Sequence, residues 1–263
     1  MAAAKQNKAP GRQESIRRIL GSLEKRYGAI YREPDEQPML ETLIYAICLE
    51  NSTFAEASTY CGRIETLFHD FNEARVSSIT ELSRIFQKSP VAEIKAYCFR
   101  HLLTHVFELF YAFDFDSLLL KSNEQANRLL RRVPELSQFA RNHTVKQCMD
   151  VHLLPVDDRM RDALAWLGMG TVGQTPQRTG SALKTDVRKG DVDRFCGLVR
   201  CLATDPKAIK IMVADIDETE GIGFELSTTV ERLKTLFVEI DTRKPKPAAK
   251  KTTATKKAAK TNE

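Results

Sequence analysis

The sequence predicts an all-α fold, and three observations support this prediction. Apolar residues recur at helical spacing through most of residues 39–151. No convincing alternation of apolar and polar residues, the pattern typical of a half-buried strand, interrupts them. With 263 residues, of which 42% are hydrophobic, the chain is long enough to bury a substantial core. We therefore expect a helical globular protein made of one large domain or two small ones.

The N-terminal half reads as a series of helices joined by short breaks. A first helix is expected from Gly11 to about Gly28, because Ile16, Ile19 and Leu23 fall on one face. Residues 32–38 should form a loop, since two prolines within this stretch interrupt helix continuation. The helices expected next span residues 40–50, 54–69, 78–86, 91–113, 122–132 and 136–150. In the 91–113 helix, the expected buried stripe is Ile94, Cys98, Leu102, Val106 and Leu109.

The C-terminal half is helical in parts. After an extended link at 151–155, a helix is expected to begin at Asp157 and to end at Gly168. Residues 168–190 are rich in glycine, threonine and charged residues, and we expect a long surface loop there. Apolar helices are expected at 192–203 and 225–240, while 209–216 is ambiguous.

The net charge of +5 is unevenly distributed along the chain. Residues 242–263 contain eight basic residues and one acidic residue, and residues 1–18 contain five and one. These ends carry +7 and +4, which leaves −6 for residues 19–241. Because affinity for a polyanion grows with the number of phosphates neutralised, the ends would have to supply most of any nonspecific binding to nucleic acid.

The two chain ends are expected to be disordered. Residues 1–11 are polar and basic, and residues 242–263 contain no large apolar residue, so neither segment can build a core. The C-terminal segment resembles the Lys-Pro-Ala tails of linker-histone-like proteins, which implies nonspecific, salt-sensitive binding to DNA. A solubility tail is the alternative. The tail lysines expected to contact DNA are Lys250, Lys251, Lys256, Lys257 and Lys260.

The segment 156–168 carries the most specific motif. It reads Val-Asp-Asp-Arg-Met-Arg-Asp-Ala-Leu-Ala-Trp-Leu-Gly and places a carboxylate at a helix start. It resembles the Val-Asp-x-x-x-x-Arg segment of the helix-hairpin-helix DNA glycosylases of the endonuclease III type. The resemblance implies that Asp157 is the catalytic aspartate. Upstream, residues 130–140 fall where this family carries its Leu-Pro-Gly-Val-Gly-x-Lys-Thr hairpin.

A weaker resemblance covers residues 38–53. Family members have a similar apolar helix that ends in a Gln-Thr-like turn, and the glutamine fills the gap left by a flipped-out base. The resemblance implies that Asn51, which is one methylene shorter, takes this role and contacts DNA. Together, the matching segments extend over roughly residues 38–205 in the order and spacing of the family.

The resemblance also implies an architecture and an activity. The fold would be two-lobed with a central cleft for DNA, with a middle helical domain at 37–151 and a second lobe built from 12–36 and 152–241. The activity would be base-excision repair, in which Asp157 stabilises positive charge on the sugar and orients water as the N-glycosidic bond of a flipped base is hydrolysed. Phe139 stands where bifunctional members carry a Schiff-base lysine, so lyase activity is not expected.

A second interpretation stays open, namely a catalytically inactive DNA-binding or protein-interaction module on the same scaffold. The hairpin glycines of the family let the backbone approach a phosphate, but Glu135 and Ser137 stand in their places here. Asp157 could equally be an ordinary N-cap, which contributes about 1 kcal/mol to stability. Phe139 could be a core aromatic.

No metal or other cofactor is expected. Six scattered cysteines read as buried thiols, and the two that follow the Asp157 segment, Cys196 and Cys201, cannot supply the four ligands of the iron–sulfur cluster found in endonuclease III relatives. His101, His105 and Glu108 share one helix face, but no fourth ligand is evident, so the flank of a buried stripe explains them better than a metal site.

Membrane insertion is not expected either. The longest uninterrupted apolar run, at residues 43–49, is far shorter than the ~20 residues needed to cross a bilayer. The first residues lack the apolar segment of a secretory signal. We expect a cytoplasmic, nucleoid-associated protein.

Overall fold

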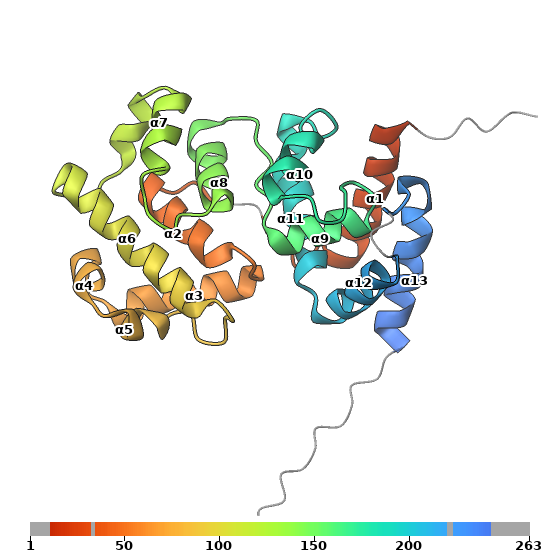
Figure 1. The fold of residues 1–263 in the computed structure, drawn as a ribbon, viewed down its shortest axis with the longest axis horizontal. Helices are drawn as coiled ribbons and strands as arrows, with labels where there is room; N and C mark the ends of the chain where they lie inside the picture. Colours follow the sequence, from red (N-terminus) through yellow and green to blue (C-terminus); the bar gives the residue numbers. More distant parts are fainter. Residues whose placement is uncertain (1–10, 33–34, 220–222, 243–263) are drawn as a thin grey trace, which may run out of the picture.

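The computed structural model describes residues 11–32, 35–219 and 223–242. These residues form thirteen α-helices and three short 3-10 helices, and no strand occurs among them (Figure 1). The α-helices are α1 (Arg12–Tyr27), α2 (Met39–Leu49), α3 (Phe54–Leu67), α4 (Phe71–Val76), α5 (Ile79–Ser83), α6 (Ala92–Phe110), α7 (Asn123–Leu130), α8 (Gln138–Met149), α9 (Asp158–Trp166), α10 (Pro176–Leu183), α11 (Val192–Thr204), α12 (Pro206–Glu218) and α13 (Thr229–Thr242). The 3-10 helices are η1 (Asp116–Leu120), η2 (Lys189–Asp191) and η3 (Leu226–Thr228).

The helices pack around two separate hydrophobic cores, which form two lobes side by side (Figure 1). The first lobe contains α2 to α8, and its buried residues lie between Met39 and Val145. Capping boxes fix the starts of α3, α5 and α7: in each, the N-cap hydroxyl accepts from the N3 backbone while the N3 side chain accepts from the N-cap backbone. Local sequence therefore sets where these helices begin.

The second lobe combines α1 with α9 to α13, so that segments far apart in the chain share one core. Trp166 is almost fully buried, and its indole N–H donates to Asp215 at 2.7 Å. The Arg232 guanidinium lies 5.3 Å from the Trp166 ring centroid. Tyr27 at the end of α1 donates to Asp205 at 3.0 Å, which holds α1 against the start of α12.

Three helices lie where the sequence was read differently. The expected loop at 168–190 contains α10, which Thr175 caps and Pro176 begins. Gly180 within it packs against the 151–155 link, because a Cβ there would stand 2.5 Å from the Leu154 carbonyl oxygen. The ambiguous segment 209–216 belongs to α12, which begins at Pro206. The short α4 lies in the break expected between the helices at 54–69 and 78–86.

The stripe expected on the 91–113 helix was wrong at both ends. Ile94 and Leu109 are exposed, whereas Cys98, Leu102 and Val106 are buried. Lys95 is buried beside them with 4% of its surface exposed. The core face of α6 is therefore rotated by one residue at its start, which brings a lysine inside.

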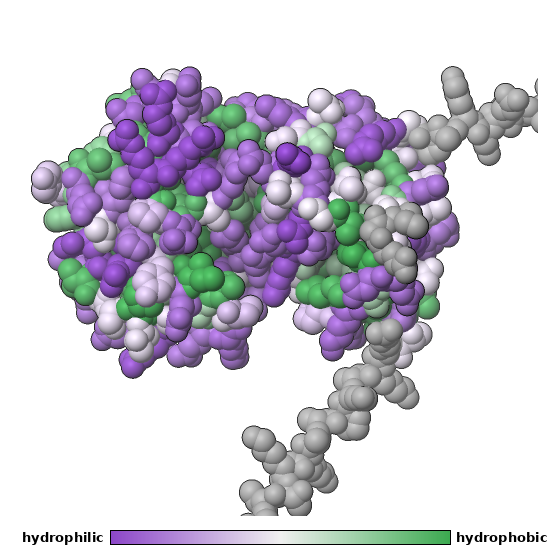
Figure 2. Space-filling view, viewed as in Figure 1, coloured by the Kyte–Doolittle hydropathy of each residue, from purple (hydrophilic) through white to green (hydrophobic). Residues whose placement is uncertain are grey.

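One expectation from the sequence concerns segments outside the described residues. The disorder expected at 1–11 and 242–263, including the tail lysines, concerns residues that lie almost entirely outside the described part of the chain. Within the described part, no helix combines the length and the apolar character needed to cross a membrane. The face in Figure 2 is mostly hydrophilic, and apolar side chains gather on it in separate patches.

Candidate nucleic-acid interface and the junction between the lobes

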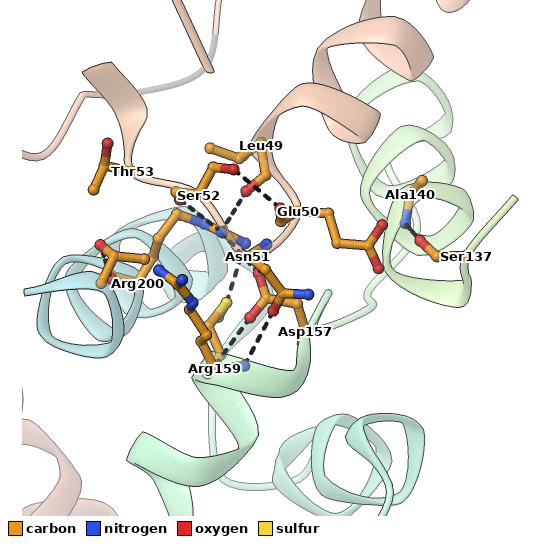
Figure 3. A network of polar contacts seen from close by, with 12 residues as sticks. Leu49, Glu50, Asn51, Ser52, Thr53, Ser137, Ala140, Asp157, Arg159 and Arg200 are labelled. Carbon is orange, nitrogen blue, oxygen red and sulfur yellow. Dashed lines mark hydrogen bonds and ion pairs between the residues drawn. The ribbon is translucent and has the colours of Figure 1, made fainter. Parts of the chain in front are cut away.

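The turn that follows α2 lies at the centre of a polar network between the lobes (Figure 3). Its residue Asn51 has a φ of +53°, a left-handed conformation that asparagine tolerates better than most residues. Thr53, two residues on, caps α3 and accepts from the backbone N–H of Glu56 at 3.1 Å. The Thr53 cap therefore fixes the residue at which the turn ends and α3 begins.

Asp157 reaches this turn from the second lobe. One carboxylate oxygen accepts from the Met160 N–H at 2.9 Å and thereby caps α9, as the sequence predicted. The other accepts from the Asn51 N–H at 2.9 Å and forms an ion pair with Arg200 at 2.8 Å. The Asp157 side chain has 0% of its surface exposed.

Asn51 completes a reciprocal contact between the lobes. Its side-chain oxygen accepts from the Arg159 N–H at 3.2 Å, at the start of α9, while its own N–H donates to Asp157. The side chain proposed to fill a gap in DNA is therefore held against the α9 backbone in this structure. Asn51 and Asp157, both expected from the sequence to lie at the site, are indeed in contact.

Arg200 on α11 lies between Phe139, which stands at the lysine position of the resemblance, and Asp157, which stands at its aspartate position. Its guanidinium carbon lies 4.8 Å from the Phe139 ring centroid on one side, and its Nη1 is paired with Asp157 on the other. The same Nη1 donates to the carbonyls of Leu49 at 2.7 Å and Ser52 at 3.2 Å. With 3% of its side chain exposed, Arg200 is a buried cation that holds the turn from the second lobe.

Lys95 holds the same turn from the first lobe. Its ammonium group donates to the carbonyls of Ile47, Cys48 and Glu50 at 2.7 to 2.9 Å and to the Ser52 hydroxyl at 3.2 Å. Burial lowers the pKa of Lys95 to about 8. The last carbonyls of a helix carry partial negative charge, so Lys95 and Arg200 together satisfy and neutralise the end of α2.

Glu50 adds an unusual carboxylate beside this network. Its side chain points toward Ser137 at the start of α8 (Figure 3). Its pKa is raised to about 6, mainly by burial and also by the charge of Asp157, while a hydrogen bond with Ser137 acts in the opposite direction. A carboxyl group that titrates near neutral pH therefore lies between α2 and the hairpin.

The hairpin between α7 and α8 is present despite the missing glycines. Glu135 has a φ of +59°, the left-handed region that favours glycine, so the turn keeps a backbone shape that a glycine would adopt without strain. Ser137 serves as the N-cap of α8, with its hydroxyl accepting from the Ala140 N–H at 3.0 Å. Arg131 and Arg132, just before the turn, are exposed.

Two other arginines near the site, Arg161 and Arg128, are already paired with carboxylates. Arg161 is paired with Asp158 at 2.7 Å and with Asp162 at 2.9 Å, so its charge is already compensated. Arg128 is paired with Glu124 on the exposed face of α7. The exposed arginines of the hairpin, Arg131 and Arg132, form no ion pair with another described residue.

Two cavities lie near the network, and Asp157 lines neither of them. The smaller has a volume of about 30 Å³ at the junction of the lobes, and Phe139 and Arg200 are among its walls. This is close to the space of one water molecule. The larger has a volume of about 710 Å³ and lies against α2, α3 and α8. The Asp157 side chain, with none of its surface exposed, opens onto neither of these two cavities.

The described residues contain no group of three or more His, Cys, Asp and Glu side chains placed to hold a metal ion. His101 stacks on Tyr97, and their ring centroids are 6.3 Å apart. Burial lowers the pKa of His105. All six cysteines are free thiols.

Sequence reasoning missed Arg200 and Lys95. A signal was present for both, since each is a lone cation inside an apolar helical run: Arg200 in Leu-Val-Arg-Cys-Leu-Ala, and Lys95 on the face that also carries Phe99 and Leu102. Such residues are almost never fully buried without partners. Their partners, the carbonyls after α2, could not be named from the sequence.

Comparisons with known proteins identify the fold. The described architecture is similar to a trapped endonuclease III–DNA covalent intermediate with an estranged adenine, at a TM-score of 0.54 and 14% identity. It is similar to the same degree to a non-covalent endonuclease III–DNA complex, at a TM-score of 0.54 and 15% identity. Each match covers 72% of this chain and 84% of the other. A thermostable thymine-DNA glycosylase has a TM-score of 0.49 and 13% identity to this chain, and the match covers 74% of this chain and 86% of the other.

No family model matches the sequence, and no curated protein matches it significantly. The all-α, helix-hairpin-helix glycosylase fold expected from the sequence is confirmed by the two endonuclease III structures. At 14% and 15% identity, the similarity establishes the fold and leaves the activity to be argued from the site itself.

Proposed function

We propose that this protein binds DNA on the glycosylase scaffold without hydrolysing N-glycosidic bonds, and that Asp157 joins the two lobes. The observation that carries this proposal is the position of Arg200 between Phe139 and Asp157. A carboxylate that assists glycosidic cleavage must reach the reacting sugar and its water. Here two backbone N–H groups and one guanidinium occupy the carboxylate, and none of its surface is exposed.

The buried arginine cannot leave without a large cost. Moving it would break its bonds to the Leu49 and Ser52 carbonyls as well as the ion pair, and would leave Asp157 as an uncompensated buried charge. The arrangement therefore favours a structural role for the aspartate.

The second candidate is a hydrolytic glycosylase in which Arg200 swings away when DNA binds. It is favoured by one observation: Asp157 stands at the start of α9, beside the hairpin, in a chain with the endonuclease III fold. The two candidates make opposite predictions about base release.

Base release provides the direct test. Duplexes carrying oxidised, alkylated or deaminated bases are incubated with the full chain, with endonuclease III as the positive control, and free base is measured. We expect no release above the rate without protein. Release that is lost in Asp157→Asn, provided that the variant is shown to be folded, would establish the hydrolytic candidate instead.

The exposed surface for DNA is expected at the hairpin and the tail. Strongly hydrophilic side chains cover the α7 end of the first lobe in Figure 2. The exposed Arg131 and Arg132 follow directly after α7 in the chain. A second concentration of basic charge is in residues 243–263, which carry eight basic residues and one acidic residue. Binding through such groups would be independent of DNA sequence, and it is the basis on which we expect a nucleoid-associated location.

Deleting residues 243–263 is expected to lower affinity for undamaged duplex DNA at least tenfold at 0.1 M salt and to flatten the salt dependence, since up to eight cations are lost. Fluorescence anisotropy over a range of salt concentrations measures both. An unchanged slope of log affinity against log salt would show that the tail makes no phosphate contacts.

Changes at Glu135 test the hairpin. Its carboxylate stands where a phosphate would approach, so Glu135→Gln is expected to strengthen DNA binding about threefold. Glu135→Gly removes the same charge and also suits the φ of +59°. Stronger DNA binding in Glu135→Gly alone would mean that the backbone shape of the turn controls its contact with DNA. Unchanged DNA binding in both variants would exclude the hairpin from the DNA-binding surface.

A further inference from the structure

Two cysteines of the first lobe touch where α2 packs against α3. Cys48 lies near the end of α2 and Cys61 lies in the middle of α3, and both belong to the same hydrophobic cluster. Their thiols form a hydrogen bond with each other. A disulfide forms only between cysteines whose side chains point toward each other, and this contact meets that condition. Neither thiol has a role in the proposed function.

The two thiols differ in their access to small molecules. Cys48 has none of its surface exposed and lines neither cavity. Cys61 is partly exposed and lines the cavity of about 710 Å³ that lies against α2, α3 and α8. This volume is many times the ~30 Å³ that one water molecule occupies in the liquid, so a small neutral oxidant such as a hydroperoxide can reach Cys61. Cys48 is then reached only through Cys61.

The contact also makes the two thiols unequal in acidity. The hydrogen bond with Cys48 lowers the pKa of Cys61, and the charge of Lys95 acts in the same direction, while burial and the charge of Glu65 oppose it. The same hydrogen bond, together with burial, raises the pKa of Cys48. Because the thiolate is the nucleophile in reactions of cysteine, Cys61 is the thiol that attacks first.

The other four cysteines lack this combination. Burial raises the pKa of Cys98, Cys148, Cys196 and Cys201. None of these four lines the larger cavity. A buried thiol with a raised pKa reacts slowly, so an oxidant at low dose should discriminate between these cysteines and Cys61.

We propose that Cys48 and Cys61 form a reversible disulfide when the protein meets a hydroperoxide. In the first step the Cys61 thiolate attacks one peroxide oxygen, the O–O bond breaks, and the second oxygen leaves and takes up the thiol proton. Cys61 is then a sulfenic acid. In the second step the Cys48 sulfur attacks the Cys61 sulfur, the S–O bond breaks, and hydroxide leaves with the Cys48 proton as water. With hydrogen peroxide, two thiols lose two electrons and the peroxide becomes two water molecules.

The bond closes a ring from Cys48 to Cys61 that contains the turn at 50–53, where Asn51 meets Asp157. Reversal needs a dithiol reductant, which restores both thiols and is itself oxidised to a disulfide. Disulfides of proteins in reducing compartments are usually of this transient, redox-sensing kind. The inference does not depend on DNA binding or on the state of Asp157.

Peptide mapping of the folded full chain after treatment with hydrogen peroxide tests the proposal. Free thiols are blocked by alkylation before digestion. Glutamyl endopeptidase cleaves after Glu50 and Glu56, which separates residues 42–50 from residues 57–65 in the reduced protein. A disulfide keeps these two peptides joined until dithiothreitol releases them. We expect the joined pair to be the main oxidation product at a peroxide dose that leaves the other four cysteines reduced.

Two variants separate the steps of the reaction. In Cys48→Ser no second thiol follows the first step, so Cys61 should remain a sulfenic acid that dimedone traps. In Cys61→Ser, the Cys48 thiol should stay reduced at the same dose. The matched control Cys148→Ser removes another partly exposed thiol of the first lobe and should change the yield of joined peptide by less than about twofold. Circular dichroism checks that each variant is folded.

Four results would overturn the proposal. Oxidation of Cys61 to a sulfinic acid in wild type without any joined peptide would mean that the two sulfurs do not meet. Oxidation of Cys148 as fast as Cys61 would mean that the contact gives no selectivity. A joined peptide that forms only in urea would place the reaction in the unfolded chain. A joined peptide found only in covalent dimers on non-reducing gels would mean that the bond links two chains.

Discussion

Replacing Arg200 by alanine is expected to destabilise the protein by about 3–5 kcal/mol, the cost of removing one partner from a buried ion pair. The variant leaves the Asp157 carboxylate without its cation in a site where neither side chain exposes more than 3% of its surface. It also removes the donor from the carbonyls of Leu49 and Ser52. Urea unfolding followed by circular dichroism measures the loss.

The same helix provides a matched control. Arg194 on α11 is paired with Glu24, but these side chains are 46% and 48% exposed. Exposed pairs contribute about 0 to 1 kcal/mol, so Arg194→Ala should change stability by no more than that. Equal losses in the two variants would mean that the Arg200 pair does not hold the lobes together, and the structural role proposed for Asp157 would lose its basis.

Much of the fold could be predicted because local signals specify it. Periodic apolar residues located the long helices, and the N-cap at Asp157 was visible from its place after Pro155. The errors have a common cause. In α10, polar and glycine-rich composition hid a helix whose Gly180 is required for close packing against another segment. Composition within a window does not report such tertiary contacts.

The site was predicted less completely for the same reason. Asp157 and Asn51 were both identified, and they do meet, but their surroundings depend on residues that are distant in the chain. Arg200 lies on another helix, and its pairing with Asp157 decides whether the carboxylate is available. A motif can name a catalytic candidate, whereas its accessibility is a property of the whole packed junction.

Replacing Glu50 by glutamine is expected to stabilise the protein by up to about 2 kcal/mol at pH 7. Burial raises the pKa of Glu50 from 4.5 to about 6, and each pKa unit corresponds to about 1.4 kcal/mol. The folded state therefore binds the proton more tightly than the unfolded state. The stabilising contribution of the protonated group is fully present below pH 4.5 and is lost as the pH rises through 6.

The difference between wild type and Glu50→Gln isolates this group from other titrating residues. We expect the difference in unfolding free energy to be near zero at pH 4.5, to grow between pH 4.5 and 6, and to level off above pH 6. Glu108→Gln, at an exposed position of α6, should show no such pH-dependent difference. A constant difference for Glu50→Gln across this range would mean that Glu50 titrates as an ordinary carboxyl, and that the start of the hairpin next to Ser137 is open to solvent. The expected curve would instead establish a destabilising carboxylate between α2 and α8, at a position where an uncharged amide would fit better.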